Sequence, residues 1–265
     1  MPTDQNRVHE GRNAMKIAVC GYGRAGKAMI ESILESNEHE LSAVLCRDGS
    51  ENASGNLSEV LYGERLSRLP DLSITPMSEA VQALDPGQVD VVVDFSHKDS
   101  ALSFVEMCGI IHSNLVICTT GHSPEEIALV GELATEKSIG VVYAPNLTVG
   151  INLLMEFVAK LSKVFGDASF EILEKHPPDK AKPTATAGLI ARSIGNGEIP
   201  VHSIRLDGFV GVHEVVASNG LERIVVSHES LSRGAFACGA LAAAAFVCGK
   251  VGLYTMEDVV NDLGE

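Results

Sequence analysis

The sequence predicts an α/β protein in which a doubly wound parallel sheet is followed by a second domain of the α+β type. Three observations lead to this fold class. Short apolar strands alternate with helices from Met15 to about residue 146, which is the pattern of repeated βα units. A Gly-x-Gly-x-x-Gly turn follows the first strand. From Asn146 onward a long helix, a proline-rich loop and three strand-like stretches replace the alternation, so we expect a second domain over residues 147–233.

The first domain begins with the β-branched run from Met15 to Cys20, and apolar residues at helical spacing predict a helix over residues 27–36. Further helices are predicted at residues 99–108 and after Ser123-Pro124, a typical helix start. The continuous apolar character of residues 89–95 indicates a strand that is buried on both faces. The other strands are predicted at residues 41–46, 115–118 and 140–144, whereas residues 47–75 are weakly patterned.

In the second domain, amphipathic helices are predicted at residues 149–164 and 184–194. Three prolines within residues 176–183 predict a loop there, because neither a helix nor a central strand tolerates them. The Ser218-Asn-Gly220 turn predicts a hairpin. The Ala- and Gly-rich helix predicted at residues 233–247 can pack closely, so we expect residues 234–265 to complete the first domain, residues 15–146. The remaining strands are predicted at residues 169–174, 201–206, 213–218 and 222–228.

Composition excludes several classes of protein. The chain has 265 residues, with 20 Lys+Arg against 35 Asp+Glu, so it has no basic excess with which to bind nucleic acid. A hydrophobic content of 45% supports a large core and excludes global disorder. The uncharged run from Gly234 to Gly249 is too short and too rich in Ala and Gly to cross a bilayer. Residues 1–14 lack the apolar stretch of a signal peptide, so we expect a cytoplasmic protein with reduced thiols. No Cys-x-x-Cys pair occurs, so we expect no metal site.

The glycine turn predicts a Rossmann-type dinucleotide site, because such glycines allow a tight turn, close approach of a pyrophosphate, and close packing of helix on strand. A glycine turn that binds nothing is the alternative, but the βα units around it favour a site. The residues expected to contact the cofactor here are Gly21, Gly23, Arg24, Ala25 and Gly26.

The end of the second predicted strand bears on the choice between NADPH and NADH. NAD enzymes place an acidic residue there to bind the ribose 2′-hydroxyl, but this chain has Cys46 followed by Arg47. A guanidinium with no carboxylate at that position favours a 2′-phosphate, and therefore NADPH. Asp48 keeps NADH as the alternative cofactor, and an ordinary solvated arginine is the alternative for Arg47.

The loop after residue 174 is the candidate catalytic segment. It carries His176, Lys180 and Lys182, and Thr184 and Thr186 follow at a helix start. Helix amides, hydroxyls and lysines together can bind an anion such as a carboxylate. His176 is the best-placed proton donor, since imidazole titrates near neutral pH. The alternative is a capped helix on an exposed basic loop.

A series of short motifs runs through the chain from about Met15 to Leu263. They are Gly-Arg-Ala-Gly at 23–26, Val-Asp-Phe-Ser at 93–96, Thr-Thr-Gly at 119–121, Ala-Pro-Asn-Leu-Thr-Val-Gly-Ile-Asn at 144–152, Glu-Lys-His at 174–176, Pro-Thr-Ala-Thr-Ala at 183–187, Val-Gly-Val-His at 210–213 and Ser-Arg-Gly-Ala-Phe-Ala at 232–237. With these motifs in this order, the sequence resembles the dihydrodipicolinate reductase family. The resemblance implies an NAD(P)H-dependent oxidoreductase that reduces a cyclic imine carboxylate in the diaminopimelate route to lysine, and a homotetramer formed through strands between residues 201 and 228.

The resemblance also implies roles for individual residues. His176 corresponds to the general acid, Lys180 to a carboxylate or proton-transfer partner, and Thr186 to the threonine of a Gly-Thr pair that contacts substrate. Lys182, Thr184 and Ala185 are expected on the substrate side as well. The residues expected on the cofactor side are Phe95, Thr119, Thr120, Gly121 and Asn146.

Three departures from the family pattern leave alternatives open. Pro177 replaces a second histidine, Lys182 stands near the usual aspartate, and Ala185 replaces the glycine before Thr186. Proline offers neither a side-chain donor nor an amide proton, so one family contact to substrate is lost. The alternatives are a diverged reductase of a related imino or keto acid in a secondary pathway, and a non-catalytic NAD(P)-binding family member.

Four other polar residues are assigned no chemistry. His97 and His122 are interpreted as polar rim residues, His213 as a structural strand residue, and Cys118 as part of the core.

Overall fold

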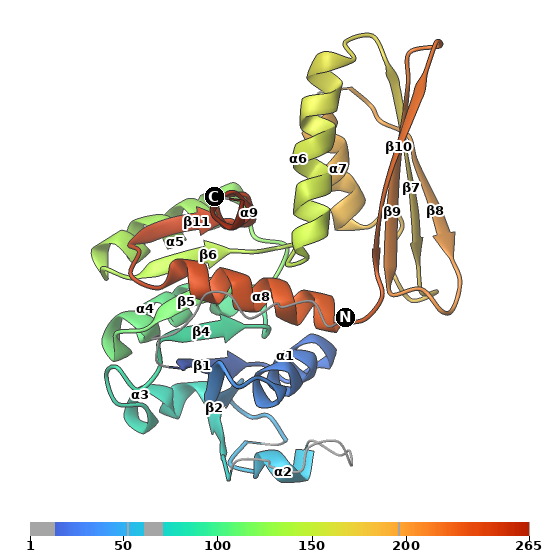
Figure 1. The fold of residues 1–265 in the computed structure, drawn as a ribbon. Coiled ribbons are helices and arrows are strands. Elements are labelled where there is room, and N and C mark those ends of the chain that lie inside the picture. Colours follow the sequence, from blue (N-terminus) through green and yellow to red (C-terminus); the bar gives the residue numbers. More distant parts are fainter. Residues whose placement is uncertain (1–13, 52, 61–70, 196, 265) are drawn as a thin grey trace, which may run out of the picture.

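The computed structural model describes residues 14–51, 53–60, 71–195 and 197–264. The polar segment 1–13 and part of the weakly patterned stretch 47–75 lie outside these residues. The described strands form two sheets, one of seven strands and one of four (Figure 1). The predicted combination of a doubly wound parallel sheet with a smaller second sheet is therefore confirmed.

The larger sheet is parallel throughout, and its strand order is β11-β6-β5-β4-β1-β2-β3. Strands β1 to β6 have the order of a dinucleotide-binding fold, in which the order of the strands reverses between β1 and β4 and ligands bind beyond the carboxyl ends of the strands. The short strands β3 and β11 were not predicted. The strands are β1 (Met15–Cys20), β2 (His39–Cys46), β3 (Ile74–Pro76), β4 (Val91–Asp94), β5 (Asn114–Ile117), β6 (Gly140–Tyr143) and β11 (Gly252–Thr255).

Helices cover both faces of this sheet, which explains why its central strands are continuously apolar. Along β4, Val91 and Val93 point into a core shared with α1 (Arg24–Glu35) and α8 (Gly234–Val247), whereas Val92 points into the opposite core. The opposite core is shared with α4 (Ala101–Ile111) and α5 (Pro124–Glu136). The smaller elements are α2 (Leu57–Val60), α3 (Ala80–Ala83), α9 (Met256–Leu263) and two 3₁₀ turns, Met77–Glu79 and Lys98–Ser100.

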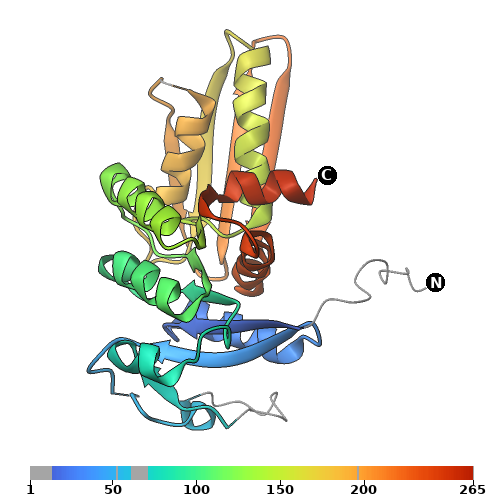
Figure 2. The ribbon, with the colours of Figure 1, turned by 90° about the vertical axis from the view of Figure 1, so that its left-hand side faces the viewer.

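The second sheet has the order β10-β9-β7-β8, with β7 and β8 parallel and the other neighbours antiparallel. Two helices, α6 (Val149–Val164) and α7 (Ala185–Ile194), pack on one of its faces (Figure 2). The antiparallel hairpin of β9 and β10 is confirmed. The strands are β7 (Ser169–His176), β8 (Val201–Arg205), β9 (Gly211–Ser218) and β10 (Arg223–Ser230).

One boundary differs from the sequence prediction in a way that matters for the site. β7 continues two residues beyond the predicted end at Glu174, so His176 is the last residue of the strand and not the first residue of a loop. Residues two apart on a strand face the same way. Glu174 and His176 therefore point together toward the helix-covered face, and both are buried.

Among the described residues, none of the helices is both long enough and apolar enough to cross a membrane.

Helix α8 packs against the segment that joins the two sheets. A Cβ atom added at Gly239 would lie 1.6 Å from the backbone carbonyl oxygen of Leu147. Leu147 lies two residues before α6, on which the second sheet packs. The absence of a side chain at Gly239 therefore sets how closely α8 approaches this connection.

We expect Gly239→Ala to lower the free energy of unfolding by about 3 kcal/mol, because a backbone atom cannot move aside as a flexible side chain can. Gly188→Ala in α7 is the matched control, since its added Cβ would meet nothing closer than Arg192 Nη1 at 3.6 Å. The control should be neutral or stabilised, because alanine favours helix. Urea denaturation of both variants measures the difference, and equal stabilities would contradict the packing described here.

Candidate functional site

A cleft of about 730 Å³ lies between the carboxyl edge of the large sheet and the second sheet. One wall is the glycine turn, and the other is formed by the end of β7 and the loop that follows it. Of the predicted cofactor residues, the cleft is lined by Gly23, Arg24, Ala25, Gly26, Phe95 and Asn146, and of the predicted substrate and catalytic residues by His176, Lys180 and Thr186. The two sets therefore face one shared space.

The glycine turn has the shape that a pyrophosphate needs. Gly21 has a φ of 82°, and a Cβ added there would lie 2.8 Å from the carbonyl oxygen of Phe95. A Cβ at Gly26 would lie 1.8 Å from the carbonyl oxygen of Gly21, so only glycine allows α1 to start this close to the strand. By contrast, nothing lies within 4 Å of a Cβ at Gly23. The open space at the N-terminus of α1, whose first turn holds no acidic residue, suits an anionic phosphate.

The other predicted cofactor residues lie outside the cleft lining. Arg47 is exposed just after β2. Thr119 is buried and its hydroxyl lies 2.9 Å from Nε2 of His122, whereas Thr120 and Gly121 are exposed. All of them follow strands of the large sheet at the same carboxyl edge as the glycine turn.

An ion pair spans the cleft. Nη2 of Arg24, in the glycine turn, lies 3.7 Å from Oδ2 of Asp179, in the loop after β7. Both side chains are largely exposed, so the pair contributes little to stability. It does show that the two walls approach to within the reach of one arginine side chain.

Beneath the second wall, Glu174 is completely buried and both of its carboxylate oxygens accept hydrogen bonds. Ser203 Oγ donates over 2.6 Å and Arg205 Nη2 over 2.6 Å to Oε1, and the Thr184 amide donates over 3.1 Å to Oε2. The Thr184 hydroxyl also donates to Oε2. Burial alone would raise the pKa of Glu174, but these bonds lower it to about 2, so the carboxylate is ionised.

Arg205 also holds the catalytic loop in place. Its Nε donates to the carbonyl oxygen of Lys180 over 3.0 Å, and its Nη2 donates to that of Ala181. The Arg205 side chain is only 4% exposed. One guanidinium thus joins β8, the buried carboxylate of Glu174 and the backbone that carries Lys180.

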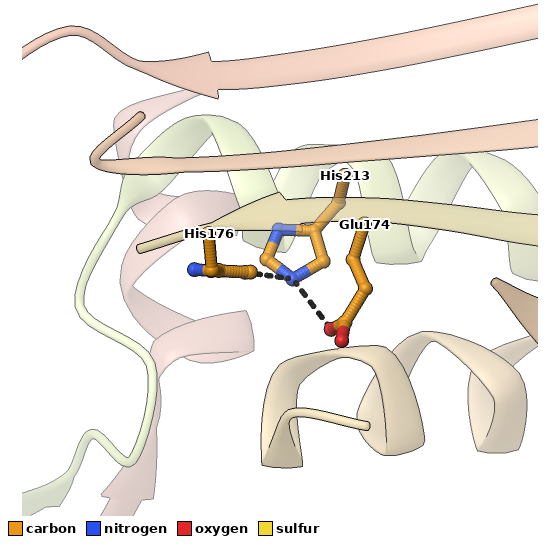
Figure 3. Close-up of side chains that lie close together, drawn as sticks. All are labelled: Glu174, His176 and His213. Carbon is orange, nitrogen blue, oxygen red and sulfur yellow. Dashed lines mark hydrogen bonds and ion pairs between the residues drawn. The ribbon is translucent and has the colours of Figure 1, made fainter. Parts of the chain in front are cut away.

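Two histidines meet above Glu174 (Figure 3). Nε2 of His176 lies 3.3 Å from Nε2 of His213, and Nε2 of His213 lies 3.9 Å from Oε2 of Glu174. His213 stands opposite Glu174 in the β7–β9 register. Gly211 leaves room for the imidazole of His176, because a Cβ there would lie 2.9 Å from Cε1 of that ring.

Both imidazoles are harder to protonate than free histidine. Burial lowers the pKa of His213 to about 4, with the neighbouring His176 acting in the same direction. Burial also lowers the pKa of His176, and Arg205 and Lys180 add to this effect. Glu174 and the backbone carbonyl of Val210 oppose it. Both rings are therefore neutral at neutral pH in the ligand-free protein.

The predicted substrate residues take different positions. Thr186 lines the cleft, and its hydroxyl accepts a hydrogen bond of 3.2 Å from Nδ2 of Asn146 at the connection between the sheets. Thr184 is buried beneath it and caps α7 by accepting from the Ala187 amide. Lys182 and Ala185 are exposed and lie outside the cleft lining.

Sequence reasoning missed the residues that support the site from other strands. Arg205 and Ser203 lie on β8, which pairs with β7 so that Glu174 stands opposite Ser203 and His176 opposite Arg205. His228 lines the cleft from β10, opposite His213. An arginine inside an otherwise strand-like run was the one available signal for this group, since a charge in a buried strand needs a partner.

The residues that were assigned no chemistry are placed as follows. His97 is exposed and pairs with Asp99, and His122 contacts Tyr143 edge-on. Cys118 lines the cleft but is a poor nucleophile, because burial, and then Asp94, raise its pKa. Three of the buried groups, Glu174, His176 and His213, have donor atoms within 4.8 Å of one another, a spacing that could also suit a metal ion. Because protein donors already occupy both oxygens of Glu174, we interpret the group as a hydrogen-bonded network.

Comparison with known proteins covers almost the whole described chain. Residues 15–147 match the family model described as dihydrodipicolinate reductase, N-terminus, and residues 150–260 match the corresponding C-terminus model. A 4-hydroxy-tetrahydrodipicolinate reductase of Blochmanniella floridana is 30% identical over 93% of this chain and 98% of its own length. One of Thermosipho africanus is 38% identical over 65% of this chain and 79% of its own length.

Solved structures agree at the level of the fold. A dihydrodipicolinate reductase of Paenisporosarcina sp. TG-14, with dipicolinate bound, superposes with a TM-score of 0.76 at 22% identity, over 93% of this chain and 99% of that one. An amine dehydrogenase of Mycobacterium smegmatis superposes with a TM-score of 0.66 at 12% identity, over 94% of this chain and 97% of that one.

We expect Glu174→Gln to lower the free energy of unfolding by about 3 kcal/mol, because it leaves the buried guanidinium of Arg205 without its counter-charge. Glu171→Gln is the matched control on the same strand, since Glu171 is exposed and pairs with the exposed His202. The control should change stability by less than about 0.5 kcal/mol. Urea denaturation at pH 7 measures both, and a tolerated Glu174→Gln would contradict the network's structural role.

The lowered pKa of His213 predicts that the free energy of unfolding falls as the pH is lowered below 7. Because its folded-state pKa of about 4 lies below the ordinary 6.5, the unfolded state binds a proton first as pH falls. Between pH 7 and pH 5 this group should remove roughly 2 kcal/mol from the free energy of unfolding. Burial is the main cause of this lowered pKa; His176, His228 and Arg205 lower it further, whereas Glu174 raises it.

The measurement is urea denaturation at several pH values in wild type and in His213→Leu. The variant should lose correspondingly less stability over the same range. Parallel pH profiles for the two proteins would show that His213 is not a buried neutral group.

Proposed function

The chain belongs to the dihydrodipicolinate reductase family, and from this premise we propose that it is a 4-hydroxy-tetrahydrodipicolinate reductase of the diaminopimelate route to lysine. As a family member it is an NAD(P)H-dependent oxidoreductase. One observation carries the proposal for this site. The glycine turn at Gly23 and the group formed by His176, Lys180 and Thr186 line the same cleft.

The proposal assigns the two walls different tasks. When bound, the nicotinamide cofactor supplies the hydride, and Gly21, Gly23 and Gly26 would hold its pyrophosphate at the start of α1. Lys180, Thr186 and the free amides of α7 would hold a substrate carboxylate. His176 would give a proton to the reduced carbon skeleton. Its lowered pKa means that the negative charge of a bound dicarboxylate must favour the protonated ring before that step.

We also propose the domain roles that accompany this function. Residues 15–146 with 234–265 would bind the dinucleotide, and residues 147–233 would bind substrate and form tetramer contacts. On the second sheet, Val225 on β10 and Ile204 on β8 are large apolar side chains that are 53% and 37% exposed. Their exposure on strands supports the use of this sheet as a contact between subunits.

A second candidate substrate is supported by Pro177. It lines the cleft next to His176, where the family pattern has a second histidine. A proline ring cannot donate a hydrogen bond to a carboxylate. A related imino or keto acid with a changed second carboxylate is therefore the second candidate, with the same fold, cofactor and acid.

NADPH oxidation tests the function when 4-hydroxy-tetrahydrodipicolinate is generated in situ by its synthase from pyruvate and aspartate semialdehyde. We expect turnover by the wild type and a kcat lower by about 10² to 10⁴ in His176→Gln, with a smaller change in KM, because a proton donor acts in the transition state. His112→Asn, at an exposed histidine that ends α4, is the control and should retain full activity, because asparagine also adopts the left-handed backbone conformation found there.

The outcomes of this assay separate the candidates. NADPH binding without turnover would favour the altered imine substrate. An unchanged kcat in His176→Gln would exclude its role as the acid.

The cofactor preference makes a separate prediction. If Arg47 binds the 2′-phosphate, Arg47→Ala should raise KM for NADPH by about 10-fold or more and leave KM for NADH nearly unchanged, since a hydrogen bond between charged groups is worth about 1.5 to 3 kcal/mol. Steady-state kinetics with both cofactors measure this. Equal effects on the two cofactors would assign Arg47 to the solvated surface.

A further inference from the structure

The contact between the two buried histidines determines where each ring carries its proton. Nε2 of His213 lies 3.3 Å from Nε2 of His176 and 3.4 Å from the hydroxyl oxygen of Thr184. His213 is 5% exposed and His176 is 6% exposed. At most one of the two facing nitrogens can carry a hydrogen, because two N–H groups pointing at each other repel.

The hydroxyl of Thr184 gives this arrangement a direction. Its shortest contact is to Oε2 of Glu174, which is an acceptor only, because Arg205, Ser203 and the Thr184 amide keep that carboxylate ionised. The single hydroxyl proton must therefore point at Glu174. The Ala187 amide donates a hydrogen bond of 3.2 Å to the hydroxyl oxygen of Thr184. Toward His213, Thr184 can act only as an acceptor.

It follows that Nε2 of His213 carries the hydrogen. A lone pair on that nitrogen would face the lone pairs of Thr184, and it would lie 3.9 Å from the negative Oε2 of Glu174. An N–H group in the same place is attracted by both. The other side of the contact is then fixed as well, since Nε2 of His176 has to accept.

Neutral His176 must consequently hold its proton on Nδ1. Figure 3 shows this nitrogen on the side of the ring turned away from His213. It is buried and makes no hydrogen bond among the described residues, but the backbone carbonyl of Val210, next to Gly211, favours protonation of this ring. The Nδ1–Cε1 edge borders Gly211, which has no side chain and lines the cleft.

We propose that His213 is a positioning residue that fixes neutral His176 in the Nδ1–H form. Thr184 and Glu174 hold His213 in the orientation that this requires. As a result, His176 presents Nδ1 as a hydrogen-bond donor to an accepting group of the ligand. Identifying that group as a substrate carboxylate rests on the proposed function; the tautomer itself does not. When His176 becomes protonated, its Nε2 also carries a hydrogen. The facing Nε2 of His213 must then be an acceptor, so neutral His213 carries its hydrogen on Nδ1.

The test is the ¹⁵N spectrum of histidine-labelled, ligand-free protein in the solid state at pH 8, where both rings are neutral. His176→Gln identifies the signals of His176 by their loss. We expect a protonated Nδ1 and an unprotonated Nε2 for His176, and the reverse for His213. A protonated Nε2 on His176 would overturn the proposal.

A matched pair of variants tests the positioning role. Thr184→Ser keeps the hydroxyl and should keep the wild-type pattern. Thr184→Val removes the hydroxyl, and His213→Leu removes the donor altogether. In both, the His176 signals should shift toward the Nε2–H form that predominates in free histidine. An unchanged His176 pattern in His213→Leu would overturn the role of His213, and if that variant does not fold, the Thr184 pair decides.

A metal ion between the two imidazoles would give a different spectrum. An ion bound by both Nε2 atoms would leave both histidines in the Nδ1–H form until EDTA is added, and this result would overturn the proposal. Because the spectra are recorded without substrate or cofactor, they do not depend on turnover. A failed NADPH assay with the expected spectra would reject the proposed reaction and leave the tautomer assignment standing.

Discussion

The buried carboxylate of Glu174 is the interaction on which the candidate site depends. Its charge stays in the interior because a guanidinium, two hydroxyl groups and an amide satisfy its oxygens. The donors come from two parts of the fold: Arg205 and Ser203 lie on β8, and Thr184 lies at the start of α7. The carboxylate thereby joins two strands and a helix at the point where the chain must present His176 and Lys180 to the cleft.

Through this network the same residues serve stability and chemistry. Arg205 neutralises Glu174 and also binds the loop backbone at Lys180 and Ala181. Thr184 caps α7 and directs its hydroxyl proton toward Glu174, which in turn sets how His213 faces His176. An apolar core can be as stable as a buried ionic network. Such a network can still be retained because it fixes one arrangement of the polar groups.

Much of the fold could be predicted from local pattern, because each central element has a strong local signal. β1 and the glycine turn match the prediction closely, and so does the amphipathic helix α6. The strands β3 and β11 were missed because they are short edge strands with little apolar run. β7 was predicted too short, since Lys175 and His176 look polar in sequence although the sheet buries His176.

The candidate site was predictable only where one segment carries it. The glycine turn is one continuous segment of the chain, and so is the stretch from His176 to Thr186. Residue spacing within each segment therefore indicated its chemistry. The register that sets Arg205 beside Glu174, and His213 beside His176, depends on strand pairing across 30 residues or more. No local spacing encodes such pairing. Thr184 shows the same limit, because only the packing of α7 on the sheet turns its hydroxyl inward.

The most direct test of the account is a crystal structure of the protein with NADP⁺ and pyridine-2,6-dicarboxylate. The account predicts the pyrophosphate at Gly23 and the N-terminus of α1, and a carboxylate bound by Lys180 and Thr186 within hydrogen-bond distance of Nδ1 of His176. A dicarboxylate bound elsewhere, or one that leaves His176 without a ligand contact, would contradict it.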